Sequence, residues 1–417
     1  MKRILILVIF IAVVEYYSFV AFKMAISRLN DKLQIALFLL YGLLILGEAF
    51  SIYAFRHWGI SALSIPWLKY VVNIFFSVLL GKLVIALIML IGDVWLIVRK
   101  AIQFFSQLAS NGQHVPSPEG NKIGRSLFIS RTAMFLGAAL TSGMIYGISN
   151  RYNYKIRRMR ISLKNLPEEF KGLKIVQLSD IHSGSFDDRA AVLKGIELVN
   201  EEKPDIVLFT GDLVNNQAPE IEPYMDVFNQ INAPMGVYSV LGNHDYGDYV
   251  QWDSEEAKQE NLDRLKQHQA DMGWRMLLNE HVVLQRGSGK IALVGVENWG
   301  AKAHFAKYGD LKKAMQGLEG QDIPVKILMS HDPSHWDAQV RKDFPDIDLT
   351  LSGHTHGMQF GIEIPGIKWS PVQYLYQEWA GLYRKGSQYL YVNRGFGFIG
   401  YQGRLGILPE ITVMELV

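Results

Sequence analysis

The sequence contains no cysteine, and this absence removes several classes of functional site. Disulfides, thiolate metal sites, haem-attachment motifs and a cysteine nucleophile are all excluded. The formal net charge is only +2, so overall charge does not indicate a nucleic-acid partner, and we expect none. The 417 residues also show no internal repeat and no low-complexity tract. A chain of this length is expected to contain more than one domain.

Hydrophobic residues make up 49% of the chain, and long runs of them occupy residues 1–150. The runs are Ile4–Phe22, Leu33–Phe55, Val72–Ile97 and Thr132–Ile148. Three of them have the length of about 20 residues with which a helix crosses the bilayer. A cleaved signal peptide would explain only the first run, and buried helices of a soluble domain are rarely this long and apolar. We therefore predict a multi-pass membrane protein whose residues 1–150 form about four transmembrane helices, with the lipid bilayer as partner.

Four charged residues interrupt these runs, namely Glu15, Glu48, Lys82 and Asp93. Charges inside a membrane span are candidates for function, but we favour structural contacts near span ends or with neighbouring helices. Lys82 and Asp93 are about 16 Å apart along a straight helix, which is too far for a direct ion pair. Basic residues are nearly balanced between the two sides of the membrane, so the positive-inside rule favours neither side for the C-terminal domain.

Residues 151–417 alternate apolar runs of strand length with amphipathic segments of helix length. The strand-like runs are Lys174–Leu178, Ile206–Phe209, Val237–Leu241, Ile291–Val296, Val325–Met329, Leu349–Leu351, Tyr389–Val392 and Ile411–Leu416. The clearest helix-like segments are Arg189–Glu202 and Glu255–Met272. This alternation predicts an α/β layered domain, in which ligands bind beyond the carboxyl ends of strands.

Polar clusters follow five of these predicted strands. They are Ser179-Asp180-Ile181-His182, Gly211-Asp212, Gly242-Asn243-His244-Asp245, Ser330-His331-Asp332 and Gly353-His354-Thr355-His356. Each cluster alone is more often a turn or a structural histidine, but five in succession after strands indicate a metal site. Carboxylate and imidazole together suit Mn, Fe or Zn. The D-x-H and H-x-H spacings suit an extended backbone, on which residues i and i+2 share one side.

The order of these clusters resembles the signature of the calcineurin-like metallophosphoesterases over about residues 155–417. That signature is D-x-H, G-D, G-N-H-[DE], a lone His and G-H-x-H. The hydrophobic runs, together with Leu166-Pro167 and the segment Ile175–His182, look most like the bacterial membrane-associated branch, which includes UDP-2,3-diacylglucosamine hydrolase-like enzymes. The resemblance implies an α/β fold of two mixed β-sheets packed face to face with flanking helices, preceded by the all-α transmembrane region.

The resemblance also implies two divalent cations, Mn, Fe or Zn, held by carboxylate, amide and imidazole groups. The ligands of the first cation are Asp180, His182 and His356, those of the second are Asn243, His331 and His354, and Asp212 bridges the two. A shared carboxylate offsets the repulsion between cations about 3.5–4 Å apart, and the pair generates a hydroxide that attacks phosphorus.

Further residues are assigned roles beyond metal binding. The resemblance implies that His244 is catalytic, by stabilising the phosphoryl charge or protonating the leaving oxygen, and Asp245 either orients its imidazole or is a turn residue. Arg394 is either a phosphate clamp or an ordinary surface arginine. The aromatic stretch Trp369–Tyr383 either packs in the core, which we favour, or meets lipid.

We predict a membrane-anchored hydrolase of a phosphodiester or pyrophosphate bond. Its expected substrate is a phosphorylated or nucleotide-linked lipid, in lipid A or envelope precursor metabolism. The alternative is a membrane sensor or scaffold whose phosphoesterase-like domain only binds a ligand. The complete ligand set and His244 argue against that alternative, and turnover of an aryl phosphodiester separates the two.

Overall fold

A computed structural model describes residues 2–58, 65–109, 122–302 and 306–417 of the chain. The chain divides into two compact units, Met1–Tyr146 and Gly147–Val417. The predicted domain boundary at residue 150 lies in the turn that follows the fourth helix.

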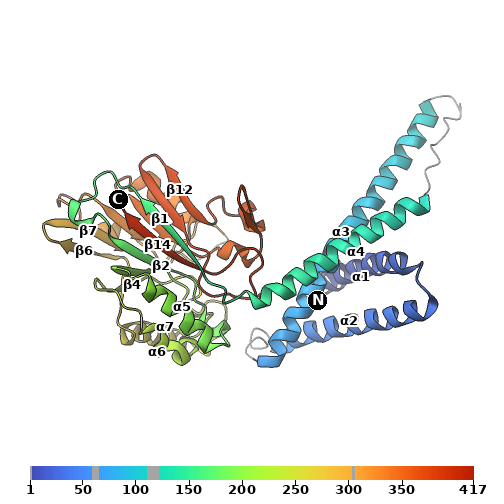
Figure 1. The fold of residues 1–417 in the computed structure, drawn as a ribbon, viewed down its shortest axis with the longest axis horizontal. Coiled ribbons are helices and arrows are strands. Elements are labelled where there is room, and N and C mark those ends of the chain that lie inside the picture. Colours follow the sequence, from blue (N-terminus) through green and yellow to red (C-terminus); the bar gives the residue numbers. More distant parts are fainter. Residues whose placement is uncertain (1, 59–64, 110–121, 303–305) are drawn as a thin grey trace. The chain divides into compact units, whose positions relative to one another are not determined.

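The described residues of the first unit form four long apolar helices, which confirms the predicted membrane region (Figure 1). They are α1 Lys2–Ile26, α2 Asp31–Trp58, α3 Pro66–Ala109 and α4 Lys122–Ser149. In each candidate span only 17–33% of the most apolar window is buried within the structure, as expected of helices whose apolar side chains face lipid. Helix α3 is longer than the predicted span, because its 44 residues rise about 66 Å, well beyond the hydrocarbon core.

Three charged side chains meet inside the membrane unit. The Lys82 ammonium on α3 lies 2.7 Å from Glu15 on α1 and 2.7 Å from Glu48 on α2. The Tyr41 hydroxyl donates to the second oxygen of Glu15 at 3.2 Å. These charges therefore join three neighbouring helices, and both carboxylates pair with the same ammonium.

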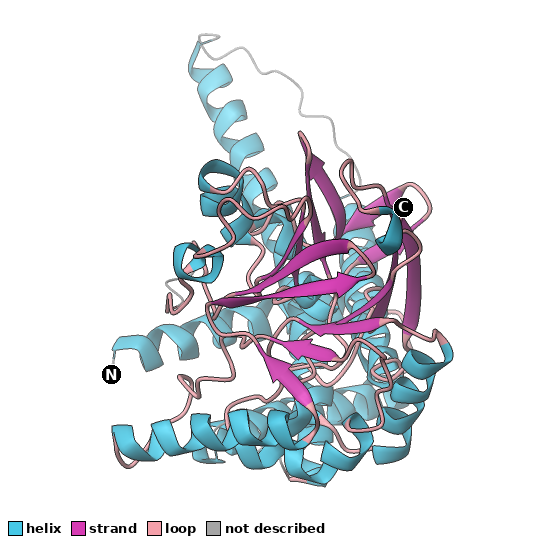
Figure 2. Ribbon diagram, turned by 90° about the vertical axis from the view of Figure 1, so that its left-hand side faces the viewer, coloured by secondary structure: helices cyan, strands magenta, loops and turns pink. Residues whose placement is uncertain are grey.

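The second unit contains two six-stranded mixed sheets, as predicted (Figure 2). The first has the order β1-β14-β2-β3-β4-β5, with bounds β1 Lys155–Ile161, β2 Lys174–Leu178, β3 Ile206–Phe209, β4 Val237–Ser239, β5 Trp274–Met276 and β14 Glu410–Leu416. The second has the order β12-β13-β9-β8-β7-β6, with bounds β6 Glu280–Arg286, β7 Gly289–Gly295, β8 Lys326–Met329, β9 Leu349–Ser352, β12 Gly381–Lys385 and β13 Gln388–Val392. A separate hairpin pairs β10 Ile362–Ile364 with β11 Ile367–Trp369.

One hydrophobic core lies between the two sheets. Ile175 and Leu208 of the first sheet belong to the same buried cluster as Leu293, Ile327 and Leu351 of the second. Helices cover the outer faces, so that both sheets are buried on two sides. On the first sheet these are α5 Arg189–Glu201, α6 Met225–Phe228 and α7 Glu255–Asp271; on the second they are α8 Leu311–Met315 and the π-helix Trp336–Val340, which runs into the short α9 Arg341–Asp343. This arrangement confirms the expected fold class of two facing sheets with flanking helices.

Candidate metal centre

All seven predicted metal ligands lie directly after strands at one edge of the two sheets. Strands β2, β3 and β4 are parallel neighbours, as are β8 and β9, so their carboxyl ends point the same way within each sheet. In chain order the ligands follow β2 (Asp180, His182), β3 (Asp212), β4 (Asn243), β8 (His331) and β9 (His354, His356). Side chains from segments up to 176 positions apart in the sequence are thereby brought to one place.

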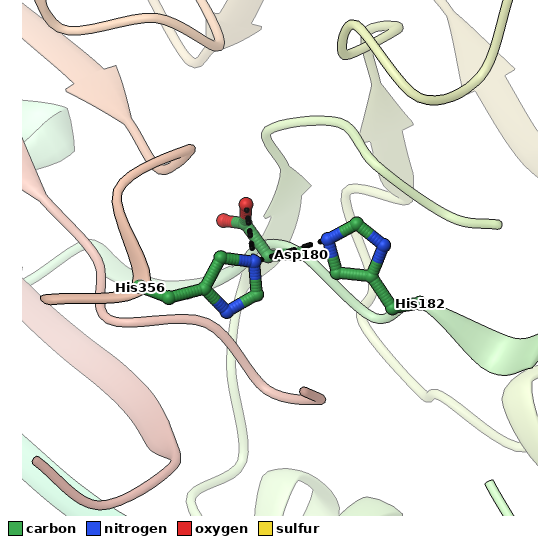
Figure 3. Close-up of side chains that lie close together, drawn as sticks. All are labelled: Asp180, His182 and His356. Atoms are coloured by element: carbon green, nitrogen blue, oxygen red, sulfur yellow. Dashed lines mark hydrogen bonds and ion pairs between the residues drawn. The ribbon is translucent and has the colours of Figure 1, made fainter. Parts of the chain in front are cut away.

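The first group of side chains comprises Asp180, His182 and His356 (Figure 3). The His356 Nε2 atom lies 3.2 Å from Asp180 Oδ1 and 3.0 Å from His182 Nε2. Burial lowers the pKa of His182 well below its usual value, so this imidazole is neutral and offers a lone pair. One carboxylate and two imidazoles therefore converge on a point that suits a divalent cation.

The second group comprises Asp212, His331 and His354, with Asn243 beside them. The His331 Nε2 atom lies 3.1 Å from Asp212 Oδ2, and His354 Nδ1 lies 2.8 Å from Asn243 Oδ1 and 3.3 Å from His331 Nε2. His331 Nδ1 donates to the Thr210 carbonyl at 2.7 Å, which leaves Nε2 facing the group. Such a second hydrogen bond fixes the ring of a metal-binding histidine.

Asp212 lies between the two groups. Its Oδ2 atom is 3.1 Å from His331 Nε2 and 3.6 Å from His182 Nε2, while Oδ1 accepts from the backbone N–H of His244 at 2.8 Å. Although burial opposes it, the Asp212 carboxylate raises the pKa of His331 to about 10. The same negative field favours a cation in place of that proton, since ligand groups must lose protons to bind metal.

The backbone at these ligands is left-handed, and the extended conformation expected for the D-x-H and H-x-H spacings is wrong. Five of the nine non-glycine residues with positive φ in the described chain are ligand candidates: Asp180, His182, Asp212, His354 and His356. Each such conformation costs on the order of 1–3 kcal/mol and persists only where the surroundings impose it. The turns carry the side chains back over the strand ends, so His354 joins the second group and His356 the first.

Two motif glycines are required by close approach. A Cβ on Gly242 would lie 2.2 Å from Asp212 Oδ1, and one on Gly353 would lie 2.1 Å from Asp180 Oδ2. Both distances are far below van der Waals contact, so any side chain there would displace a ligand carboxylate. The glycines of G-N-H and G-H-x-H thus leave room for the opposing aspartates.

His244 stands at the pocket beside both groups. The pocket is lined by His182, Asp212, Asn243, His244, Tyr249, His354, His356 and Ile399. The Nδ1 atom of His244 donates to the Asn215 carbonyl at 2.8 Å, and its ring packs against Tyr249 with centroids 4.6 Å apart. The carbonyl holds the ring in place and leaves Nε2 as the atom able to exchange a proton with a bound molecule.

Asp245 is buried, and its carboxylate accepts hydrogen bonds from the backbone. Its carboxylate accepts from the N–H groups of Asp212, Leu213 and Gly242 at 2.8–2.9 Å. The His244 imidazole is held by the Asn215 carbonyl, so of the two roles considered for Asp245 these contacts favour the turn residue over the group that orients the imidazole. Burial and the Asp212 charge raise the pKa of Asp245 to about 7. Asp245 ties the G-D turn to the G-N-H turn, and a direct catalytic part for it stays a prediction.

Two tyrosines that the motifs do not contain position ligands. The Tyr249 hydroxyl accepts from Asn243 Nδ2 at 2.8 Å, which turns the amide oxygen toward His354. The Tyr376 hydroxyl lies 3.0 Å from His354 Nε2 and donates to Asp332 at 3.4 Å. Tyr376 belongs to the aromatic stretch, of which Trp379 is also buried, whereas Tyr374 is 76% exposed. The favoured core location thus holds for part of that stretch only.

Two arginines lie behind the first group. Arg394 is buried and pairs with Glu410 at 2.6 Å and Glu363 at 2.7 Å, so it is neither a surface arginine nor a phosphate clamp. Arg404, which sequence reasoning missed, donates to the carbonyls of His356 and Gly397. It thereby holds the loop that carries His356.

Both units match families of known proteins. The family model described as "Calcineurin-like phosphoesterase" matches residues 173–358, and one described as "Probable Calcineurin-like phosphoesterase, transmembrane domain" matches residues 1–151. A "Transmembrane protein with metallophosphoesterase domain" of Danio rerio is 31% identical over 71% of this chain and 68% of its own length. The "Uncharacterized metallophosphoesterase YkuE" of Bacillus subtilis is 32% identical over 71% of this chain and 98% of its own.

Proposed function

This chain belongs to the calcineurin-like phosphoesterase family, and we propose that it hydrolyses a phosphodiester or pyrophosphate bond in a lipid-attached substrate at the membrane. It is a membrane-anchored, metal-dependent phosphoesterase. The proposal concerns the residues that act, the bond that is cleaved and the class of substrate. One observation carries it: two groups of buried carboxylates and imidazoles meet at Asp212, beside a pocket that His244 lines.

The donor atoms fit two divalent cations. In this proposal the first cation has the ligands Asp180, His182 and His356, the second has Asn243, His331 and His354, and Asp212 touches both. When bound, the cations supply an acidified water and positive charge beside the phosphoryl oxygens. His331 and His354 are held by Thr210 and Tyr376 through their other ring nitrogens, which is the support that metal-binding histidines need.

His244 is proposed to act on the substrate itself. Because its Nδ1 is held by the Asn215 carbonyl, Nε2 is the atom that protonates the leaving oxygen or contacts the phosphoryl group. The nearby Tyr249 ring restricts the imidazole to this orientation. Removal of such an acid–base group typically lowers kcat by about 10²–10⁴-fold.

The membrane location supports the choice of a lipid-attached substrate. Tethering raises the local concentration of the enzyme at its substrate without adding catalytic groups. Only five residues, 150–154, separate the end of α4 from the start of β1, so the second unit cannot travel far from the bilayer. A nucleotide-linked lipid of the UDP-2,3-diacylglucosamine type, in lipid A or envelope precursor metabolism, is the specific substrate that we propose.

The test is turnover by the full-length protein in detergent with Mn²⁺, comparing an aryl phosphodiester, an aryl phosphomonoester and a nucleotide-linked lipid. We expect His244→Ala to keep two cations while kcat falls, and Asp212→Asn to lose cations together with activity. His268→Ala is the matched control, because that histidine lies on α7 and bonds Glu222. Metal-loaded protein that turns over none of the three substrates would instead support a ligand-binding sensor.

A further inference from the structure

The hairpin β10–β11 has its polar face toward the protein and its apolar face outward. Antiparallel pairing places Ile362 opposite Trp369 and Ile364 opposite Ile367, so these four side chains share one face. Glu363 lies opposite Lys368 and, by alternation, on the other face. This pattern is the reverse of that expected for a hairpin on the surface of a soluble domain.

Ion pairs and a hydrogen bond fix this orientation. Glu363 lies 2.7 Å from Arg394 and 2.6 Å from Arg157, and Lys368 donates to the carbonyl of Ala380. Arg394 is itself buried and paired with Glu410. Because a shift of register by one residue would bury the isoleucines and expose the charges, these contacts hold the apolar face outward.

The outward face exposes three isoleucines. Ile362, Ile364 and Ile367 are 48%, 55% and 53% exposed. At one end Trp369 donates through Nε1 to the hydroxyl of Tyr374, which is 76% exposed. Aliphatic side chains flanked by tryptophan and tyrosine are typical of surfaces that enter the lipid headgroup region.

The base of the hairpin is linked by hydrogen bonds to the end of the last membrane helix. Gly147 lies in the final turn of α4, and its carbonyl accepts from the N–H of Arg404 at 2.8 Å. The next residue, Leu405, accepts through its carbonyl from the N–H of Gly361 at 2.9 Å, one residue before β10. The candidate span of α4 ends at Ser149, and Gly147 belongs to the same compact unit as the hairpin.

We propose that Ile362, Ile364 and Ile367 enter the lipid headgroup and upper acyl region of the bilayer that holds α4. The occupant of this apolar face is thus membrane lipid, because backbone hydrogen bonds through Leu405 and Arg404 join the hairpin to Gly147, in the last turn of a candidate membrane span. The hairpin follows His356 in the chain and precedes Tyr376, which contacts His354. Seating it in lipid brings the segment that carries both histidines to the membrane surface, where lipid-attached phosphates are found.

The absence of native cysteine allows a direct test on the full-length chain. A single cysteine at Ile364 or Ile367 is labelled with an environment-sensitive fluorophore, and the protein is reconstituted in phospholipid vesicles. The matched control is Ser387→Cys, at the exposed turn between β12 and β13. We expect a blue shift, and quenching by nitroxide groups on lipid acyl chains, at positions 364 and 367 but not at 387.

Each other outcome would overturn the proposal. An unshifted spectrum at 364 and 367 would show that the face remains in water. A blue shift without quenching by lipid nitroxides would show contact with protein, such as a second copy of this chain. The measurement needs no substrate, so its result is independent of whether the proposed reaction is correct.

A second measurement links the hairpin to catalysis and rests on the proposed function. Replacing Ile364 and Ile367 together by serine should lower turnover of a lipid phosphoester in vesicles while leaving turnover of a soluble aryl diester unchanged. Equal turnover of the lipid ester by the variant and the parent protein would contradict the lipid-seating role. If neither substrate is turned over by the parent protein, the proposed function fails and the fluorescence result still decides the lipid contact.

Discussion

Substitution of Tyr376 by phenylalanine should weaken one cation site and spare the other. The hydroxyl is the partner of His354 Nε2 at 3.0 Å, and the ring is buried. Phenylalanine leaves the imidazole N–H without this acceptor, at a cost of about 1–3 kcal/mol or about 5- to 150-fold in affinity. Asp332 lies 3.7 Å from the same nitrogen and offers a weaker replacement, so we expect a loss near the lower end of the 10–100-fold typical of such supporting groups.

Competition with a chelator measures the affinity of each cation separately. In the Tyr376→Phe variant the weaker site should be the one that contains His354, so that limiting chelator removes one cation and leaves the other. Tyr374→Phe is the matched control, because that exposed hydroxyl bonds Trp369 and Gln373, and neither residue is a ligand candidate. Equal affinity in variant and parent, or the same loss at both sites, would refute the inference that Tyr376 positions His354.

Three further predictions concern stability and the independence of the second unit. Lys82→Met should lower the melting temperature of the full-length protein in detergent, because breaking a buried ion pair costs about 3–5 kcal/mol. Adding Glu15→Gln and Glu48→Gln should restore the melting temperature, because no unpaired carboxylate is then left. The fragment 147–417 should fold alone and turn over a soluble diester with the kcat of the full chain; a folded, metal-loaded but inactive fragment would contradict this. Burial lowers the pKa of His335 to about 4. Below pH 6.5 the unfolded chain therefore binds a proton that the folded chain does not bind, and the free energy of unfolding should fall by up to about 3 kcal/mol between pH 6.5 and 4. His335→Gln should flatten that part of the pH–stability curve.

Much of the site could be predicted from sequence because its residues are tied to strand ends. Each apolar run that we expected to precede a ligand cluster contains a strand, and parallel neighbours bring their carboxyl ends together. The left-handed backbone at Asp180 and His354 could not be predicted, because these residues meet only in the folded domain, where the N–H of His354 donates to the Asp180 carboxylate at 3.0 Å. Spacing alone predicts an extended backbone. In that conformation His354 and His356 would point to the same side, whereas in the structure they belong to different groups.

The residues that were missed are joined to the site only through tertiary contacts. Tyr249 and Tyr376 lie outside every motif, and an aromatic stretch carries no signal that singles out one hydroxyl. The partners of the charged residues in the membrane unit could not be predicted either, for the same reason. Spacing along one helix correctly excluded a pair between Lys82 and Asp93, but the actual partners of Lys82 lie on two other helices.

Each of the two candidate cation groups contains side chains from both sheets. In the first group Asp180 and His182 come from the first sheet and His356 from the second; in the second group Asp212 comes from the first sheet and His331 from the second. Neither sheet alone presents a complete ligand set. A cation bound to either group would therefore link the two sheets. Because ligands that bind only the folded state stabilise it, metal binding and the packing of the sheets should be coupled. Cations bound to these groups would then stabilise the left-handed turns that hold the ligand candidates.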